Sequence, residues 1–212
     1  METEVEQFKR ALVVNSAGFG VELQSEHIER LSSYYELLLK WNPKLHLVAP
    51  CSPEEFAVRH ILESLTLLKH VPTNAHVADV GTGAGLPIIP CLLMRDDLHG
   101  VLIESTQRKA AFLKEAIRPI KSPARTQLIV ARFEDVPCPD VDFITCRALD
   151  KFSELLPKLI AWAPPEVTYL FFAGESLLEQ IRKLLPVRSV ERIPQSEKRF
   201  LVTAGVHENQ HC

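Results

Sequence analysis

The sequence predicts an α/β protein in which a helical extension precedes a parallel sheet. Apolar side chains recur at helical spacing over residues 4–70. From His76 onward, short apolar runs alternate with longer segments of helical spacing. Strands that are apolar throughout and separated by helices are typical of a parallel sheet covered on both faces. The expected fold is therefore a Rossmann-like sheet with an N-terminal helical extension.

Three helical segments are predicted before the sheet, in "VEQFKRALVV", "SEHIERLSSYYELLLKW" and "SPEEFAVRHILESLTLLKHV". The third has a strong start signal, because Ser52 can act as N-cap, Pro53 suits the first helical position and Glu55 can close a capping box. We place the boundary near residues 72–74. Residues 1–72 then form a helical cap and residues 73–212 form the sheet domain, within a single compact unit.

The strands of the sheet are predicted from five apolar runs, "HVADV", "GVLIE", "QLIVA", "VDFITC" and "VTYLFF". Helical spacing recurs between or after these runs, for example in "TQRKAAFLKEAI" and "SLLEQIRKLL". The last two runs of the chain, "PVRSVERI" and "KRFLVTAG", have no helical segment between them. We therefore expect them to pair as an antiparallel hairpin at the edge of the sheet.

The composition is that of a cytoplasmic globular protein. Of its 212 residues 46% are hydrophobic and its net charge is −3, while its longest apolar runs are too short to span a bilayer. The charged segment "METEVEQFKR" lacks the apolar core of a secretion signal. Five cysteines without a C-x-x-C pair fit reduced thiols. We expect a cytoplasmic location, no membrane partner and no metal site.

Basic residues gather in two segments although the whole chain is slightly acidic. Residues 105–132 hold seven basic residues against Glu115, and residues 182–199 hold six against Glu191 and Glu197. Such asymmetry can create a phosphate-binding face on an acidic protein. A solvated helix face explains either segment taken alone equally well. The charge pattern by itself therefore leaves both interpretations open.

The segment "DVGTGAGLP", which begins at Asp79, predicts a ligand site. It places Gly81, Gly83 and Gly85 directly behind a strand, where glycine allows a sharp turn and a close approach of a ligand to the backbone. The dinucleotide-binding fingerprint would need glycine at position 86, where leucine stands. The spacing G-x-G-x-G after an acid is instead typical of S-adenosylmethionine-dependent methyltransferases. Asp79 can meet the cationic amino group of that cofactor, whereas it would repel a pyrophosphate.

A second acid lies where an adenosine would need it. Glu104 ends the second predicted strand, and the carboxyl ends of parallel strands border the ligand crevice. A carboxylate there can accept hydrogen bonds from both ribose hydroxyls, although a surface glutamate at a strand end is the alternative. Glu134 and its neighbouring backbone are expected near the adenine. The predicted cofactor site comprises Asp79, Gly81, Thr82, Gly83, Gly85, Leu86, Glu104, Ser105, Glu134 and Arg147.

Four motifs together resemble one family. "HILESL" (60–65), "DVGTGAGLPIIP" (79–90), "LIESTQRKAAFLKE" (102–115) and "ITCRAL" (144–149) are similar to motifs of the bacterial 16S ribosomal RNA guanine-N7 methyltransferases, the RsmG or glucose-inhibited division protein B family. "WNPKLHLV" and "VRHILES" lie where that family has W-N-x-x-x-N-L-T and V-R-H-x-x-D-S. The resemblance covers nearly the whole chain. It implies the class I methyltransferase sheet and S-adenosyl-L-methionine as cofactor.

The resemblance also implies a substrate and partners. In this family the target is a guanine of 16S ribosomal RNA near the decoding centre, guanine 527, and basic residues around the site meet the RNA. Arg59, Arg108, Lys109 and Arg199 match basic positions of the family and are expected to bind RNA phosphates. The expected partner is therefore 16S ribosomal RNA or the small ribosomal subunit, and the expected oligomeric state is a monomer.

The chain departs from the family pattern at several positions. Ile88 stands where the family has glycine, Glu104 where it has aspartate, and His46 and Val48 where it has asparagine and threonine. Ala173 replaces the lysine of an A-L-K-G strand, and no neighbour in the sequence obviously supplies the lost cation. Two alternatives stay open. One is a non-catalytic RNA- or ribosome-binding relative, and the other is a small-molecule methyltransferase, which scattered basic segments would favour.

Methylation of guanine N7 needs alignment and no general base, because N7 has a free lone pair and loses no proton. Arg147, at the end of the fourth strand, is the candidate catalytic residue, since arginine can orient a guanine or a phosphate. Contact with O6 or phosphate is favoured, because a cation opposes the charge that develops on N7. An internal ion pair with Asp142 or Asp150 is the alternative. His60 is expected to have a supporting role near the cofactor.

Overall fold

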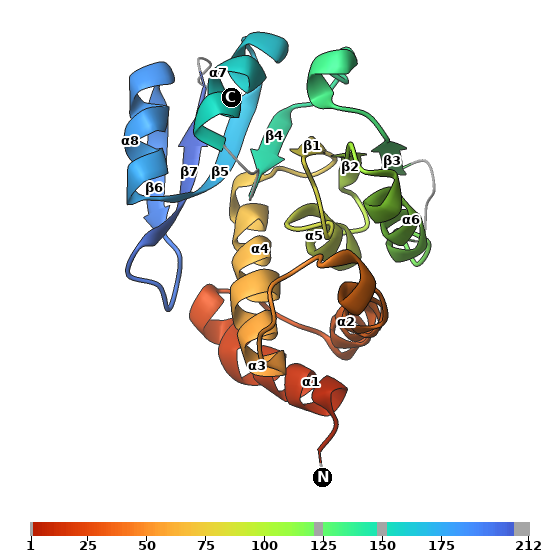
Figure 1. Cartoon of the computed structure of the whole chain (residues 1–212). Coiled ribbons are helices and arrows are strands. Elements are labelled where there is room, and N and C mark those ends of the chain that lie inside the picture. The colour runs from red at the N-terminus through yellow and green to blue at the C-terminus, as the bar shows by residue number, and fades with distance from the viewer. Residues whose placement is uncertain (1, 121–124, 148–151, 206–212) are drawn as a thin grey trace.

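The computed structural model describes residues 2–120, 125–147 and 152–205 (Figure 1). Its first part is helical, as predicted, and consists of α1 (Glu4–Asn15), η1 (Ser16–Phe19), α2 (Ser25–Leu45), α3 (Pro53–Phe56), η2 (Ala57–Leu62), α4 (Glu63–Leu65) and η3 (Thr66–His70). The last four follow one another without a break, and η2 is a π-helical turn. Within the described ranges, no helix has both the length and the hydropathy needed to cross a membrane.

The helical segment that begins at Pro53 starts where the sequence predicts. The Ser52 hydroxyl accepts a hydrogen bond from the backbone N–H of Glu55 at 3.1 Å, and Pro53 occupies the first helical position. The Glu55 carboxylate, however, pairs with the Arg59 guanidinium one turn later. The N-cap is therefore confirmed, while the carboxylate expected to close the capping box is engaged elsewhere.

The rest of the described chain forms a seven-stranded sheet with intervening helices. The strands are β1 (His76–Val80), β2 (His99–Ile103), β3 (Thr126–Ile129), β4 (Phe143–Cys146), β5 (Thr168–Gly174), β6 (Val187–Arg192) and β7 (Arg199–Ala204). The helices are α5 (Ile88–Met94), α6 (Gln107–Ala116), η5 (Phe133–Asp135), α7 (Phe152–Trp162) and α8 (Glu175–Leu184). The strand order is β3-β2-β1-β4-β5-β7-β6, and β7 alone runs in the direction opposite to the other strands. The α/β fold and the antiparallel edge hairpin are confirmed.

The register of the central strands brings three predicted site segments to one edge. Asp79 of β1 pairs with Leu102 of β2 and with Thr145 of β4. The chain that follows each strand therefore emerges at the carboxyl edge of the parallel sheet, with β1 in the middle. Glu104 follows β2 and Arg147 follows β4, so both flank the loop that follows β1.

The two faces of the sheet are covered by different helices (Figure 1). α7 and α8 pack on one face, where Leu159 and Ile181 are buried. The N-terminal helices share the other face with α5 and α6, and Phe8 and Leu31 belong to the same buried cluster as Leu102 of β2. The helical extension thus shares a core with the sheet. The division of the chain at residue 72 stays a prediction.

Candidate active site

The glycine loop (residues 81–87) leaves β1 at the carboxyl edge of the sheet. Gly81, Gly83 and Gly85 have φ angles of 69°, 57° and 84°. These angles lie in the left-handed region, which glycine adopts without a steric penalty. The backbone N–H of Gly81 donates to the carbonyl of Ile103 at 2.9 Å. The loop is therefore tied to the end of β2, the strand that leads to the second predicted acid.

An alanine in place of Gly85 is expected to destabilise the protein by about 1–3 kcal/mol. The added Cβ would lie 2.2 Å from Cδ1 of Ile89, at a φ that side chains rarely adopt. Urea denaturation measures the change. The matched control is Gly18→Ala, whose Cβ would meet Gln195 only at 3.8 Å, and we expect it to shift stability by less than about 1 kcal/mol. Equal losses in the two variants would contradict this account of the loop.

Asp79 lies beneath the glycine loop and is fully buried. Its Oδ2 accepts a hydrogen bond from the Thr82 hydroxyl at 2.6 Å. Burial raises the pKa of Asp79 to about 7, and the hydrogen bond from Thr82 acts in the opposite direction. The carboxyl group therefore anchors the loop through Thr82. Its contact with the ammonium group of a cofactor stays a prediction.

Glu104 connects the glycine loop to the start of α6. Its Oε2 accepts a hydrogen bond from the backbone N–H of Gly83 at 3.1 Å, and its Oε1 accepts one from Thr106 at 2.8 Å. The residue is 5% exposed. Each carboxylate oxygen has a further lone pair that can accept another hydrogen bond. Glu104 is therefore an ordered acceptor at the carboxyl edge and not a solvated surface glutamate.

Two cavities adjoin Gly81. The first cavity, of about 350 Å³, includes Ser105, Phe133 and Glu134 in its lining, and the second cavity, of about 280 Å³, includes Leu47, Val48, Lys109 and Arg147. Most of the predicted cofactor residues line one or both, namely Gly81, Thr82, Gly83, Leu86, Ser105, Glu134 and Arg147. The other three, Asp79, Gly85 and Glu104, belong to the glycine loop or are in its direct vicinity. The structure therefore gathers the predicted set around the carboxyl edge.

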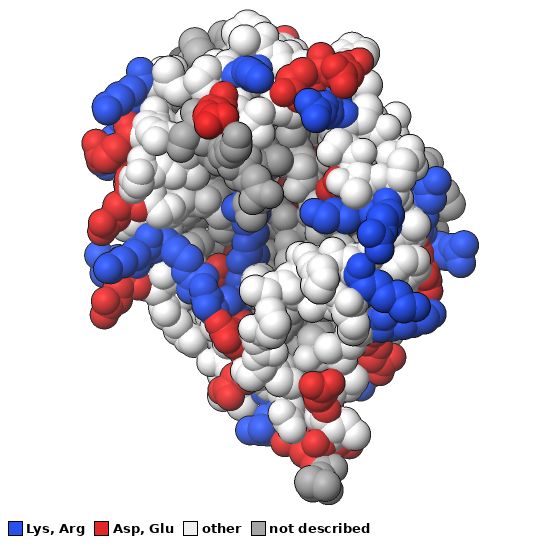
Figure 2. Space-filling model, viewed as in Figure 1, with Lys and Arg blue, Asp and Glu red and all other residues white. Residues whose placement is uncertain are grey.

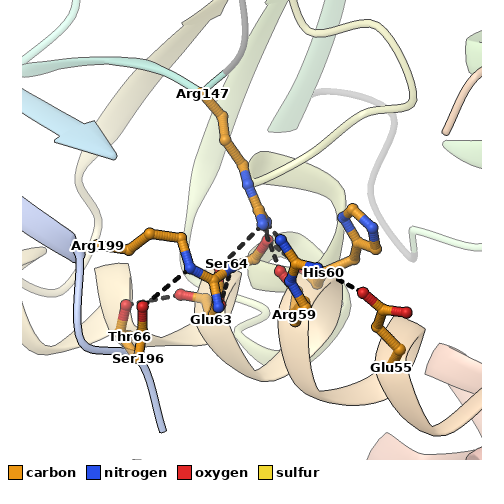
Figure 3. Close-up of polar contacts among 9 residues, drawn as sticks. All are labelled: Glu55, Arg59, His60, Glu63, Ser64, Thr66, Arg147, Ser196 and Arg199. Carbon is orange, nitrogen blue, oxygen red and sulfur yellow. Dashed lines mark hydrogen bonds and ion pairs between the residues drawn. The ribbon is translucent and has the colours of Figure 1, made fainter. Parts of the chain in front are cut away.

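Arg147 reaches from the end of β4 to the helical segment that contains η2 and α4 (Figure 3). Its NH1 donates to the carbonyl of His60 at 3.1 Å and to the hydroxyl of Ser64 at 2.9 Å. Its NH2 donates to Oε2 of Glu63 at 3.0 Å and to the carbonyl of Arg59. A guanidinium group has five N–H donors. Four of them are thus directed at the helical segment, which fixes the orientation of the group.

Among the described residues, Arg147 forms an ion pair with Glu63, a residue that the sequence did not single out. Its side chain is 3% exposed. Asp142, one partner considered from the sequence, accepts a hydrogen bond from the backbone N–H of His76 at the opposite end of β4. Asp150, the other, lies outside the described residues. Glu63 lies within the motif "VRHILES", which could mark it as a candidate site residue. The motif does not indicate, however, that its partner is an arginine 84 residues away.

Arg199 of β7 binds the same carboxylate from the other side (Figure 3). Its NH1 lies 2.5 Å from Oε1 of Glu63. A third cavity, of about 240 Å³, is lined by Arg59, Arg147 and Arg199 together with Ala173. The three guanidinium groups therefore border the place where the sequence comparison with the family indicates a lost lysine. The positive charges at this place therefore belong to side chains that the fold brings close to Ala173 from elsewhere in the sequence.

The four predicted RNA-binding residues lie in two groups, one at the third cavity and one at or near the second. Arg59 and Arg199 line the third cavity, while Lys109 lines the second cavity and Arg108 donates to the carbonyl of Lys44 at 3.3 Å. Figure 2 shows basic side chains on both sides of a hollow in this face of the molecule. Arg108 and Lys109 of one basic segment and Arg199 of the other therefore lie near the carboxyl edge, whereas Arg125 and Arg188 bind the carbonyls of Leu98 and Gly205. Their contact with RNA stays a prediction.

His60 lines the second cavity with a neutral ring. Its ring centroid lies 5.1 Å from that of Phe56, and the residue is half-buried. Burial, together with the positive charge of Arg147, lowers the pKa of His60 to about 3. The residue therefore adds no charge to the site near neutral pH, in keeping with a supporting role.

Ile88, which stands where the family pattern has glycine, packs in the core. Ile88 is fully buried, and its Cγ1 would lie 3.3 Å from a Cβ added to Gly100 of β2. The absent side chain at position 100 therefore leaves room for the isoleucine. Nothing in this packing closes either cavity beside Gly81, so Ile88 gives no support to a loss of ligand binding.

Comparison with known proteins extends these observations. The family model of the rRNA small subunit methyltransferase G (GidB) matches residues 27–208. The ribosomal RNA small subunit methyltransferase G of Geobacter sp. (strain M21) is 30% identical over 180 residues, covering 84% of this chain and 82% of that protein. The protein of the same name from Paracoccus denitrificans (strain Pd 1222) is 39% identical over 154 residues, covering 72% and 79%.

Solved structures share the fold at low sequence identity. A SAM-dependent methyltransferase from Aquifex aeolicus superposes with a TM-score of 0.55 at 17% identity, covering 72% of this chain and 93% of that one. A protein of the NADB-Rossmann superfamily from Streptococcus agalactiae gives a TM-score of 0.55 at 14% identity, covering 69% of each chain. These similarities confirm the predicted Rossmann-like sheet.

Proposed function

Since the chain belongs to the rRNA small subunit methyltransferase G family, we propose that it transfers a methyl group from S-adenosyl-L-methionine to N7 of a guanine in 16S ribosomal RNA. The observation that carries this proposal is the glycine loop held between Asp79 and Glu104, with a cavity on each side of Gly81. We further propose guanine 527 as the target, the cytoplasm as the place of action and a monomer as the active form.

The residues around the glycine loop fit S-adenosyl-L-methionine. Glu104 has the spare acceptor capacity that two ribose hydroxyls need, and the apolar first cavity, with Phe133 and Glu134, suits an adenine. Glycine stands at three loop positions of positive φ, and because it has no side chain it leaves the backbone open where a ligand would lie. The second cavity would then receive the amino acid end of the cofactor and the base. When bound, this cofactor supplies a methyl group activated by its positive sulfur.

The protein has to align the methyl donor with the base and to tolerate the positive charge that develops on the base. In-line transfer requires two reactants held collinear and close together, which can contribute roughly 7–11 kcal/mol. Guanine N7 gives up no proton, so the chain needs no general base. Lys109 and the neutral His60 line the second cavity beside the loop and would bound the position of the base.

The proposed role of Arg147 follows from its hydrogen bonds. Its terminal N–H groups bind the helical segment, so among the described residues the Nε–H is the donor left for RNA. Recognition of guanine by both terminal nitrogens would first require those bonds to break. We therefore favour a phosphate or O6 contact through Nε, together with the fixed positive charge of the group.

Transfer of labelled methyl groups tests the proposal. The purified protein is incubated with labelled S-adenosyl-L-methionine and with small ribosomal subunits, naked 16S RNA or no RNA, and the modified base is mapped. Label in a single guanine, at N7, is the expected result. Label in neither RNA, although calorimetry detects cofactor binding, would instead point to a small-molecule substrate. No binding of the cofactor would favour a non-catalytic relative.

Lys109→Ala removes one positive charge and is expected to weaken RNA binding. If Lys109 contacts one phosphate, the slope of log K against log salt should become shallower by about 0.7–0.9, the contribution of one phosphate contact. Filter binding at several salt concentrations measures the slope. The matched control is Lys114→Ala on the exposed side of the same helix, which should leave the slope unchanged. Identical slopes for the wild type and Lys109→Ala would exclude this contact.

A further inference from the structure

Helix α2 contacts both the glycine loop and the segment of residues 47–49, and these two parts of the chain line the second cavity. We propose that Tyr34 and Asn42 of α2 are positioning residues for methyl transfer. Tyr34 fixes the glycine loop, and Asn42 fixes the wall formed by residues 47–49, which we call the acceptor wall. This inference rests on the proposed function, because it assigns the acceptor base to the second cavity.

Tyr34 fixes the loop through a single buried hydrogen bond. Its hydroxyl donates to the carbonyl of Ala84 at 2.7 Å, and the residue is 3% exposed. Ala84 lies between two glycines of positive φ, so the loop has few side chains of its own to hold its shape. Burial raises the pKa of Tyr34, which keeps the hydroxyl protonated and able to donate. The bond therefore fixes the distance between the loop backbone at Ala84 and helix α2.

Asn42 fixes the acceptor wall through a reciprocal pair of hydrogen bonds. Its Oδ1 accepts from the backbone N–H of Val48 at 3.0 Å, and its Nδ2 donates to the carbonyl of Val48 at 3.2 Å. The chain turns back after α2 at His46, whose φ is 50°. Residues 47–49 belong to no helix or strand. Without the amide of Asn42, this wall would lack its two bonds to the end of α2.

Helix α2 can serve as a common frame because it is anchored at two further points. Arg30 donates to the carbonyl of Leu93 in α5 at 3.1 Å, and the indole of Trp41 donates to Glu115 of α6 at 3.0 Å. The loop and the acceptor wall are thus held by one element, which is itself bonded to α5 and α6. The width of the second cavity, and with it the distance from methyl donor to acceptor, depends on these two side chains. A displacement of 1 Å can slow an aligned transfer by about a hundredfold.

The test separates the two roles by kinetics. Tyr34→Phe is expected to raise the Kd for S-adenosyl-L-methionine about fivefold, as the loss of one hydrogen bond predicts, and to leave KM for RNA unchanged. Asn42→Leu, of similar shape, is expected to lower kcat/KM for RNA by about tenfold to a hundredfold, with cofactor Kd unchanged. Calorimetry measures cofactor binding, and labelled-methyl kinetics on 16S RNA or small subunits measures the rest.

Two further variants exclude a general loss of structure. Tyr35→Phe, next to Tyr34 but stacked on Phe8 in the helical core, should leave cofactor binding unchanged. Asn42→Asp keeps the acceptor for the Val48 N–H and should recover part of the RNA kcat/KM. An unchanged cofactor Kd in Tyr34→Phe, or RNA kinetics of Asn42→Leu within twofold of the wild type, would overturn the inference. A wild-type protein that binds the cofactor but modifies no RNA would contradict the proposed function instead, and calorimetry would still decide the role of Tyr34.

Discussion

Replacing Glu104 with alanine is expected to weaken S-adenosyl-L-methionine binding by about a hundredfold or more. Two hydrogen bonds from ribose hydroxyls to a carboxylate contribute about 1.5–3 kcal/mol each, and 1.4 kcal/mol corresponds to a factor of ten. The carboxylate also holds the backbone N–H of Gly83, so its loss loosens the glycine loop as well. Titration calorimetry with the purified protein measures the effect directly.

Two variants refine the Glu104 experiment. Glu104→Asp keeps both acceptor oxygens one methylene shorter, and we expect it to retain more cofactor affinity than alanine does. Glu179→Ala removes a different carboxylate, which is exposed on α8 and pairs with Arg182. That control should bind the cofactor with wild-type affinity. If Glu104→Ala binds as tightly as the wild type, the assignment of Glu104 to the ribose is wrong.

The sequence predicts the carboxyl-edge part of the site well because its signals are local. Gly81 and its neighbours follow a short apolar run, and Glu104 follows the next one. In a parallel sheet, the ends of adjacent strands meet at one edge whatever the details of packing. The Gly83 to Glu104 hydrogen bond is a consequence of that topology. Two patterns that are separate in the chain therefore locate one site.

The interior partners of Arg147 could not be predicted in the same way. Glu63 and Ser64 lie in a segment whose helical spacing indicates a buried face but not which strand end faces it. The proximity of Arg199 to Ala173 likewise depends on the pairing of β5 with β7, in which Gly174 lies opposite Arg199. Strand pairing of that kind is a non-local contact. The sequence alone therefore predicts that Ala173 removes a positive charge from the site without replacement.

Replacing Glu63 with alanine is expected to destabilise the protein by about 3–5 kcal/mol and to abolish methyl transfer. Its carboxylate bridges Arg147 and Arg199, and removing one member of a buried ion pair leaves the partner charge uncompensated in a medium of low polarity. The guanidinium of Arg147 would then lose its orientation beside the second cavity. Urea denaturation should show a lower midpoint with an unchanged m value, which reports stability rather than altered compactness.

The contrast with Glu55 shows why burial decides the size of this effect. Glu55 also pairs with an arginine, Arg59, one helical turn away, but the two side chains are 40% and 51% exposed to water. Exposed pairs of this type contribute about 0.2–1 kcal/mol, because water screens the charges and each side chain loses conformational freedom. Glu55→Ala should therefore cost less than about 1 kcal/mol. A loss for Glu63→Ala no larger than for Glu55→Ala would mean that the bonds of Arg147 to Arg59, His60 and Ser64 suffice to hold it, and that the buried carboxylate does not organise the site.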